Sequence, residues 1–363
     1  MSASHQRGIA VITVLLALAL GMLISSEIIM RVYMGMKRST NQFNALQAWE
    51  YALGGEEWAR QRLGKDFEED KNRGKQVDHF GEEWAMPAQS LSIEGGFIEI
   101  EVYDAQARFN LNNLVDEAGQ INAQQVQVFR RLLQQVGISS VYADMAGKWA
   151  SYADDAGSEY GSSELPYKAG DTQFGSVSEL RLLKGMPLDL YARLRPYVVV
   201  LPTPTAININ TASEPVLASL SKQATAEKLK PFLEQRRSLK EGFSAPEQYI
   251  NAMGIQKDED IDKHSLAVES DFFEIRVRTE YNGRRCYLAS LVYRDGKTGE
   301  IRLLSRDRSQ RFEFETSLRD KKKRKQEEDE DEEDSEDNND DRADGKNNAD
   351  TGHESAAARR QDD

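Results

Sequence analysis

Ile9 to Ile24 reads IAVITVLLALALGMLI, an uncharged and almost wholly apolar stretch. The chain stays uncharged from there up to Glu27. A helix needs about 20 such residues to cross the hydrocarbon core of a bilayer, so this stretch nearly spans one. Arg7 lies just before it, and a basic leader tends to stay in the cytoplasm. We therefore expect a single-pass inner-membrane anchor with the rest of the chain outside. The alternative is a cleaved signal peptide, but the stretch is long for one and no convincing A-x-A site follows it.

Helical periodicity continues past the membrane segment. No proline occurs before Pro87, and apolar residues recur at three- and four-residue steps. The members of this expected apolar face are Ala45, Leu46, Trp49, Ala52, Leu53, Ala59 and Leu63. The pattern predicts one rod of roughly 50 residues, about 75 Å long, whose second half is amphipathic. A simple tether would not need that second half.

Two regions carry the period-two alternation of strands. The first is Gly96–Asp104. The second comprises Phe272–Tyr281, Arg284–Tyr293 and Glu300–Ser305, separated by Asn282-Gly283 and Asp295-Gly296, and Asn-Gly is a strong hairpin signal. We expect these four strands to form one antiparallel sheet against the second half of the helix. The fold class is therefore α+β.

A helical block from about Asn122 to Leu266 separates the two strand regions, so it is an insertion into the sheet domain. Within it, Phe174-Gly-Ser-Val-Ser-Glu-Leu leads to Gly185, and Phe243-Ser-Ala-Pro-Glu-Gln-Tyr leads to Gly254. Ser176 with Glu179, and Ser244 with Glu247, have the spacing of a capping box. This echo predicts two similar helical units.

The N-terminal residues resemble the type IV pilin and pseudopilin family, in which a prepilin peptidase cuts after a glycine that precedes the apolar helix. Gly8 would be the last leader residue, and Ile9 the new, N-methylated N-terminus. Most members have a glutamate at the fifth mature position, whereas this chain has Thr13. A carboxylate in an apolar helix needs a cation, which in the family is thought to be the N-terminal amine of the neighbouring subunit. A subunit with no neighbour ahead of it has no such need.

That departure resembles the minor pseudopilin K of the type II secretion system (general secretion pathway protein K family), the large subunit proposed to cap the tip. Phe109-Asn-Leu-Asn-Asn-Leu114 and Asn208-Ile-Asn-Thr-Ala-Ser213 also look like family elements. The resemblance implies a pilin-like long helix on an antiparallel sheet, with a large inserted all-α domain of helix-hairpin-helix or SAM-like type. The expected divisions are leader 1–8, helix 9–63 (transmembrane 9–26), sheet domain 64–119 and 268–318, insert 120–267, and tail 319–363.

The resemblance also implies partners and a place. These are the other minor pseudopilins (I, J and H types), the major pseudopilin, the prepilin peptidase, secreted substrates and the outer-membrane secretin. The folded part would lie in the periplasm, and the function would be to support protein export across the outer membrane.

An acidic loop, WASYADDAGSEYGSSE from Trp149 to Glu164, offers closely spaced oxygen ligands of the kind that suit calcium. The candidate ligands are Asp154, Asp155 and Glu159. In the family a W-x-D-x-D segment followed by G-x-E is associated with calcium, but here Ser151 and Ala153 stand where the two aspartates would align. Either Asp154 and Asp155 substitute for them, or the loop is simply solvated surface.

The main alternative is a membrane-anchored helix-hairpin-helix receptor for DNA, because Asn208 to Ile255 resembles such modules. Their glycine hairpin offers backbone amides to phosphate. Here the corresponding stretch is Leu220-Ser-Lys-Gln-Ala-Thr225, without glycine, and the net charge of −14 is unfavourable to nucleic acid. We expect no nucleic-acid partner.

No enzyme motif stands out. The four histidines (His5, His79, His264 and His353) are scattered, and neither His-Glu-x-x-His, Gly-x-Ser-x-Gly nor a Walker A loop is present. Cys286 is the single cysteine, so no intramolecular disulfide can form. From Arg319 onward, Lys321–Lys325 and an acidic run give a composition that predicts disorder. We expect a non-catalytic assembly subunit.

The calcium prediction has a direct test. If Asp154, Asp155 and Glu159 bind the ion, calorimetric titration of calcium into the protein will release or absorb heat, and calcium will raise the melting temperature. A triple variant with Asn, Asn and Gln at these positions will lose both signals. Absence of heat and of a melting shift in the unsubstituted protein would rule the site out.

Overall fold

The computed structural model describes residues 3–86, 89–152, 167, 169–170, 172–255, 265–312 and 314. The chain divides into two units, residues 1–311 and 312–363. The helices and strands below belong to the first unit. In the second, Phe312 and Phe314 are described, with ring centroids 5.4 Å apart. The predicted tail, 319–363, lies outside the described residues.

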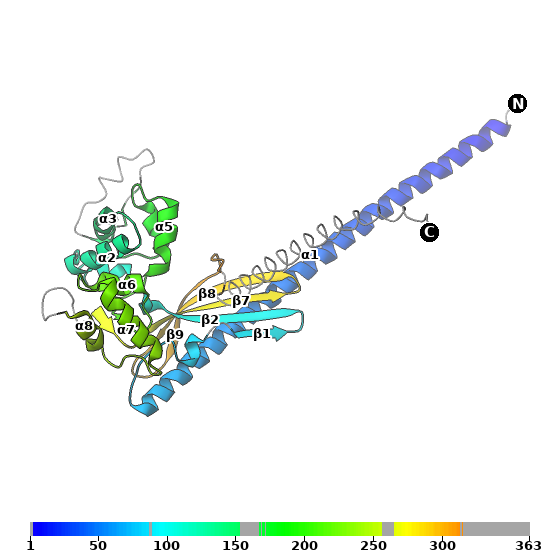
Figure 1. The fold of residues 1–363 in the computed structure, drawn as a ribbon. Coiled ribbons are helices and arrows are strands. Elements are labelled where there is room, and N and C mark those ends of the chain that lie inside the picture. The colour runs from blue at the N-terminus through cyan, green and yellow to red at the C-terminus, as the bar shows by residue number, and fades with distance from the viewer. Residues whose placement is uncertain are drawn as a thin grey trace, which may run out of the picture. The chain divides into compact units, whose positions relative to one another are not determined.

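Helix α1 runs without a break from Ala3 to Arg73 (Figure 1). The prediction that it ends at Leu63 is wrong. The last turns are charged but helical, because Lys65 and Glu69 pair at 3.3 Å across one turn. Gly74, with φ of 68°, supplies the left-handed residue that follows the helix end.

Five antiparallel strands form one sheet in the order β1-β2-β7-β8-β9. Their bounds are Gln89–Ile93 for β1, Gly96–Asp104 for β2, Phe272–Tyr281 for β7, Arg284–Arg294 for β8 and Ile301–Asp307 for β9. The four predicted strands are confirmed. Strand β1 is additional, and Gly95 (φ 82°) lies in the turn that joins it to β2.

The two predicted turns have different outcomes. Asn282 and Gly283 both have positive φ (45° and 75°), as a two-residue type I′ turn between β7 and β8 requires. The expected Asp295-Gly296 turn is instead a longer loop. The Asp295 carboxylate accepts two backbone N–H bonds inside it, at 2.9 and 3.0 Å, and Gly299 (φ 74°) leads out of it.

The C-terminal half of α1 packs on the sheet through small side chains. Figure 1 shows β2, β7 and β8 lying beside this half of the helix. The buried helix residues recur every three or four positions: Ala48, Ala52, Gly55, Ala59 and Leu63. A Cβ built on Gly55 would lie 2.8 Å from Val277 Cγ1, so the glycine sets how closely helix and sheet approach.

The helix face predicted from the sequence was partly wrong. Ala52, Ala59 and Leu63 are buried as expected, but Leu46 is 63% exposed, and Ala45 is exposed too. The sheet meets the side of the helix that carries Ala48 and Gly55, where the backbones come closest. Leu46 is thereby left on the uncovered side.

The insert between β2 and β7 has a hydrophobic core of its own, in which Phe109 stacks on Phe129 and Phe232 on Phe243. Its helices are α2 (Ala123–Gln135), α3 (Val141–Ala150), α5 (Leu188–Leu194), α6 (Glu214–Leu220), α7 (Ala226–Ser238) and α8 (Glu247–Met253). It also contains two short parallel strand pairs, β3 (Phe109–Asn110) with β4 (Val198–Val199) and β5 (Ile207–Asn208) with β6 (Leu266–Ala267). The insert is therefore mainly, but not wholly, helical.

The predicted pair of similar units is visible in the hydrogen bonds of two buried asparagines. Asn112 Oδ1 accepts the backbone N–H of Phe174 (2.8 Å), and its Nδ2 donates to the Phe174 carbonyl (3.1 Å). Asn210 makes the same two bonds with Phe243, at 2.7 and 3.0 Å. Each unit thus has one asparagine that fixes the chain just before a helical turn.

The capping prediction holds for one of these turns. Ser176 and Glu179 form a capping box at the start of a short helix, Val177–Leu182. In the second unit the expected box of Ser244 and Glu247 is wrong. There Gln248 Oε1 accepts the Ser244 N–H at 2.8 Å, because α8 begins after Pro246, whose φ of −59° is compatible with a helix start.

The close helix-sheet contact at Gly55 yields a stability prediction. Gly55→Leu will clash with Val277 and Ile100, at a cost of about 1–3 kcal/mol in the free energy of unfolding. Gly54→Leu is the matched control, because a Cβ on Gly54 meets nothing within 4 Å and glycine disfavours helix. Urea unfolding of the detergent-solubilised full chain measures both. Equal midpoints for the two variants would contradict the packing described here.

Candidate functional site

Gly8, Ile9 and Thr13 all lie within α1. Thr13 is exposed, and so are its apolar neighbours Val11, Ile12, Val14 and Leu15. Cleavage after Gly8 and methylation of Ile9 therefore stay predictions, as does the meaning of Thr13. The structure adds that α1 from Val11 to Leu15 presents its side chains to the surroundings and not to the folded part of the chain.

The N-terminal part of α1 is long and apolar enough to cross a membrane, and its most apolar window has no buried residue. The charged pair that follows, Glu27 and Arg31, is joined at 2.7 Å across one helical turn. Apolar side chains stay exposed beyond this pair, among them Val32, Met36 and Phe43. An apolar surface of this length needs either lipid or another protein to cover it.

The candidate calcium ligands Asp154, Asp155 and Glu159 lie outside the described residues. Ser151, which stands at a position where the family resemblance implies an aspartate, is buried and donates its hydroxyl to the Gly119 carbonyl at 3.0 Å. That side chain is thus engaged in holding the insert together.

The connection where a DNA-binding hairpin would need glycine runs from Ser221 to Thr225, between α6 and α7. Ser221 Oγ accepts the Gln223 N–H at 3.1 Å, and Ala224 is buried. Arg236, further along α7, donates to the carbonyls of Ile209 and Ala212, and burial lowers its pKa to about 10. These groups hold the fold and do not form a cradle for phosphate.

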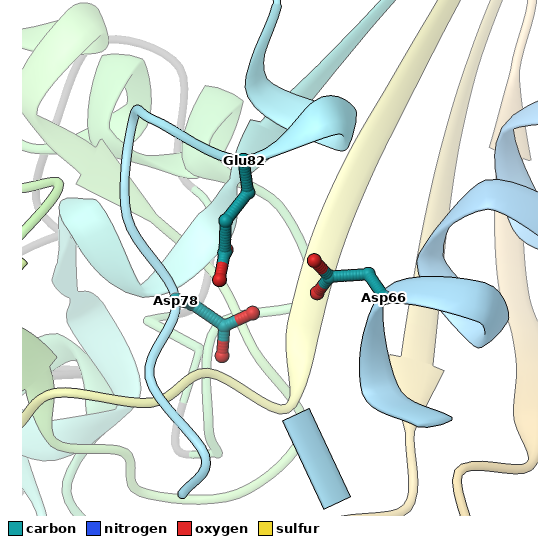
Figure 2. A group of neighbouring side chains, drawn as sticks. All are labelled: Asp66, Asp78 and Glu82. Atoms are coloured by element: carbon teal, nitrogen blue, oxygen red, sulfur yellow. The ribbon is translucent and has the colours of Figure 1, made fainter. Parts of the chain in front are cut away.

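A cluster that the sequence did not predict lies at the end of α1. Ligand-type oxygens of Asp66, Asp78 and Glu82 lie within 4.8 Å of one another, and all three residues are buried (Figure 2). Asp66 belongs to α1, while the other two lie in the connection between α1 and β1. Three buried carboxylates this close require a counter-charge or a proton.

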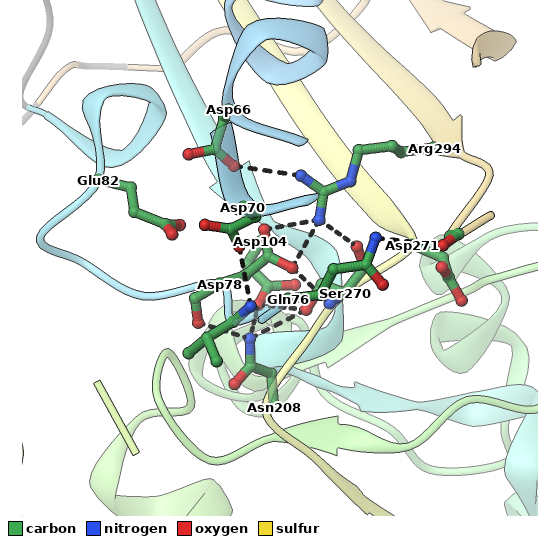
Figure 3. A network of polar contacts seen from close by, with 12 residues as sticks. Asp66, Asp70, Gln76, Asp78, Glu82, Asp104, Asn208, Ser270, Asp271 and Arg294 are labelled. Carbon is green, nitrogen blue, oxygen red and sulfur yellow. Dashed lines mark hydrogen bonds and ion pairs between the residues drawn. The ribbon is translucent and has the colours of Figure 1, made fainter. Parts of the chain in front are cut away.

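Arg294, the last residue of β8, supplies the counter-charge (Figure 3). Its guanidinium is 6% exposed and contacts Asp78 through both carboxylate oxygens (2.7 and 2.6 Å). It also contacts Asp66 at 3.3 Å and donates to the Ser270 carbonyl at 2.9 Å. The guanidinium carbon lies 4.7 Å from the ring centroid of Phe273. The arginine thus occupies the side of the cluster where a cation would otherwise sit. We call Asp66, Asp78, Glu82 and Arg294 the junction cluster.

Glu82 is held by different donors. Its Oε2 accepts the Trp84 indole N–H at 2.6 Å and the His79 backbone N–H at 3.1 Å. The imidazole of His79 lies 3.6 Å from Oε1, and burial lowers the pKa of that ring. Burial, with the charges of Asp66 and Asp78, raises the pKa of Glu82 to about 9.

Next to the junction cluster, Asp104 joins the sheet to the insert. It ends β2, and its Oδ2 accepts bonds from Asn208 Nδ2 (3.0 Å), Thr211 Oγ1 (2.5 Å) and Ser270 Oγ (2.7 Å). Asn208 Nδ2 also donates to the Asp78 carbonyl at 3.0 Å. The corresponding asparagine of the first unit, Asn110, bonds only within the insert among the contacts described. The second unit is thus adapted to dock on the sheet.

The sequence contained a partial signal for the junction cluster. Asp66 and Asp70 are spaced i,i+4 on a helix, where like charges destabilise unless something compensates them. Nothing local indicated that the compensation comes from Arg294, 228 residues away. Asn208 lies in the Asn-x-Asn-Thr-Ala-Ser stretch noted in the sequence, so that motif did point to a structural position.

An exposed apolar helix whose C-terminal half packs on an antiparallel sheet is typical of a membrane-anchored, pilin-like subunit. Residues 107–203 match the family model described as Type II secretion system (T2SS), protein K. Type II secretion system protein K of Pseudomonas aeruginosa is 34% identical over 318 residues, covering 84% of this chain and 93% of the relative. The protein of the same name from Klebsiella pneumoniae is 31% identical, covering 81% and 94%. The chain belongs to the type II secretion system protein K family.

A solved structure agrees with the fold. The GspK-GspI-GspJ complex from the enterotoxigenic Escherichia coli type 2 secretion system contains a chain that aligns with a TM-score of 0.62. The alignment covers 76% of this chain and 100% of that chain, at 23% identity. The expected fold class is confirmed: a long N-terminal helix on an antiparallel sheet, with a large insert that is mainly helical.

Arg294 gives a stability prediction with an internal control. Arg294→Leu will leave Asp78 buried without its cation, at a cost of about 3–5 kcal/mol. Adding Asp78→Asn will recover much of that loss, because the uncompensated charge is removed. Arg302→Leu breaks the exposed pair with Glu300 (2.6 Å) and will leave the urea midpoint unchanged. An Arg294→Leu midpoint equal to that of the unsubstituted chain would contradict the role given to this arginine.

Proposed function

We propose that this chain is a non-catalytic minor pseudopilin that caps the tip of the pseudopilus together with other minor pseudopilins, and so supports protein export across the outer membrane. One observation carries the proposal. Apolar side chains of α1 stay exposed beyond the membrane segment, at Met36, Phe43 and Leu46, and no described part of the protein covers them.

The length of that surface distinguishes an assembly helix from a tether. From Ile9 to Met36 the helix is about 42 Å long, against a hydrocarbon core of about 30 Å. Phe43 (59% exposed) and Leu46 lie further still from the membrane. Lipid cannot cover these distal side chains, whereas parallel helices of neighbouring subunits can.

The position within the filament rests on Thr13 and on the insert. A threonine where the family usually has glutamate gives no carboxylate to pair with the N-terminal amine of a subunit ahead. The insert enlarges the folded part between β2 and β7, so it would obstruct a further subunit above it. Both features suit the last subunit of an assembly.

The proposed partners follow from the family. The solved complex of GspK contains GspI and GspJ, so the I- and J-type subunits are the first candidates here, followed by the H type and the major pseudopilin. The prepilin peptidase would cleave after Gly8 and Ile9 would then be methylated. The folded part would lie in the periplasm, within reach of secreted substrates and the secretin. Calcium at Asp154, Asp155 and Glu159 belongs to the same proposal.

The proposal is tested in the host membrane with the full chain. Phe43→Glu places a charge on the exposed apolar face of α1, so it will reduce co-purification of the I- and J-type subunits and lower secretion. The matched control is Leu188→Glu, because Leu188 is 64% exposed but lies in the insert. Recovery of the unsubstituted chain alone, from membranes that contain both partners, would contradict the proposal.

A further inference from the structure

The junction cluster carries more negative charge than its one guanidinium balances. Arg294 contacts Asp78 and Asp66, while Glu82 receives its closest bonds from the uncharged donors of Trp84 and His79. Glu274 shows the opposite balance in the same sheet. Burial raises its pKa, but Arg108 and Arg276, each at 2.6 Å, bring it down to about 2.

The excess charge favours bound protons. Burial, followed by the charge of Asp78, raises the pKa of Asp66 to about 7, against the opposing effect of Arg294. The pKa of Glu82 is about 9 for the reasons given above. Near neutral pH, the folded cluster therefore retains a proton that the same side chains would release in an unfolded chain.

The location of the cluster gives this proton a structural consequence. The chain leaves the sheet for the insert at Asp104 and returns to the sheet just after Ser270. Ser270 bonds to both Asp78 and Asp104, and Asn208 Nδ2 donates to the Asp78 carbonyl. Asp78 N donates to the Val268 carbonyl at 2.9 Å, and Asp78 Oδ2 accepts the Ser270 N–H at 2.7 Å. The connection 74–86, which also carries Glu82, therefore braces the base of the insert.

We propose that the junction cluster is a proton-controlled clamp, in which protonated Asp66 and Glu82 let the connection 74–86 hold the base of the insert, and their ionisation loosens it. This control by protons goes beyond the proposed function, which does not require it. It acts at the two points where the chain crosses between sheet and insert, so its opening changes how firmly the insert is held on the sheet.

Charged groups from every neighbouring element face Asp66 and Glu82. Cations other than Arg294 lie at the rim of a small cleft of about 160 Å³ beside the cluster, and acids line both the rim and the interior. The groups are Arg62, Lys65, Glu69, Asp70 and Arg73 from α1, Asp78, His79 and Glu83 from the connection, Asp104 from β2, Lys240 and Glu241 after α7, Glu269 and Asp271 before β7, and Arg294 from β8. Burial lowers the pKa of His79, which favours the neutral form of its ring.

The sign of the pH effect follows from the raised pKa values. A carboxyl group that binds its proton more tightly in the folded state stabilises that state in acid, and this contribution falls as pH rises. For Asp66 the fall runs from its ordinary value, 3.8, to about 7, and for Glu82 from 4.5 to about 9. The clamp is therefore tighter at pH 5 than at pH 9.

Hydrogen exchange of the detergent-solubilised full chain tests the clamp. Protection factors, corrected for the intrinsic pH dependence of exchange, are compared at about pH 5 and about pH 9. We expect the protection factors of the connection 74–86, β5 and β6 to fall as pH rises. The fall will be about tenfold per pH unit wherever one carboxyl is protonated in the closed state and ionised in the open state. Protection of the β7–β8 hairpin will change less, which separates local opening from global unfolding.

Isosteric variants assign the effect. Asp66→Asn and Glu82→Gln each remove one ionisable group. Each variant will therefore show a smaller pH dependence of the protection factors in 74–86. Glu69→Gln is the matched control on the rim of the same cleft, and it will keep the pH dependence of the unsubstituted chain. Protection that is the same at both pH values, or an undiminished pH dependence in the double variant Asp66→Asn/Glu82→Gln, would overturn the proposal.

Discussion

The guanidinium of Arg294 joins three parts of this protein that are distant in sequence. It extends from the end of β8 to Asp66 on α1 and to Asp78 in the connection that follows the helix. Through Asp78 and Ser270 it also reaches the base of the insert. A buried charge of this kind is not a strong source of net stability, because desolvation offsets much of the attraction. Its effect is specificity: a displaced helix, connection or insert would leave a charge buried without its partner.

Helix α1 meets two different requirements along its length. Its C-terminal half uses Ala48, Gly55 and Ala59 to approach the sheet closely, and the helix is fixed there by core packing. Its N-terminal half has no such support within the described chain and presents apolar side chains all round, as a segment in lipid or among other helices would. The same continuous helix thus connects the membrane to the junction cluster. The helix contains no proline that would kink it.

Local patterns predicted the local structure well. Alternation in 96–104 and 272–305 identified four of the five strands, and Asn282-Gly283 identified the hairpin. The end of α1 was misplaced because Lys65 to Arg73 is rich in charge and lacks an apolar period, although Lys65–Glu69 and Asp70–Arg73 have the spacing of helical ion pairs. Leu46 was assigned to the wrong face because periodicity shows that a face exists and not which side the sheet will cover.

The junction cluster was missed because its partners, Asp66 and Arg294, meet only in the folded chain. Hydrophobic patterns gave the order of the elements and the family resemblance agreed with it, while the roles of Asn112, Asn208 and Asn210 emerged from their hydrogen bonds.

The central claim is that this subunit ends a filament. Electron microscopy of pseudopili assembled with the full chain, tagged with a gold label in the insert, tests it most directly. The account predicts one label per filament, at one end, and filaments that start from complexes containing the I- and J-type subunits. Labels distributed along the filament shaft would contradict the account, because they would require subunits to stack above the insert and above Thr13.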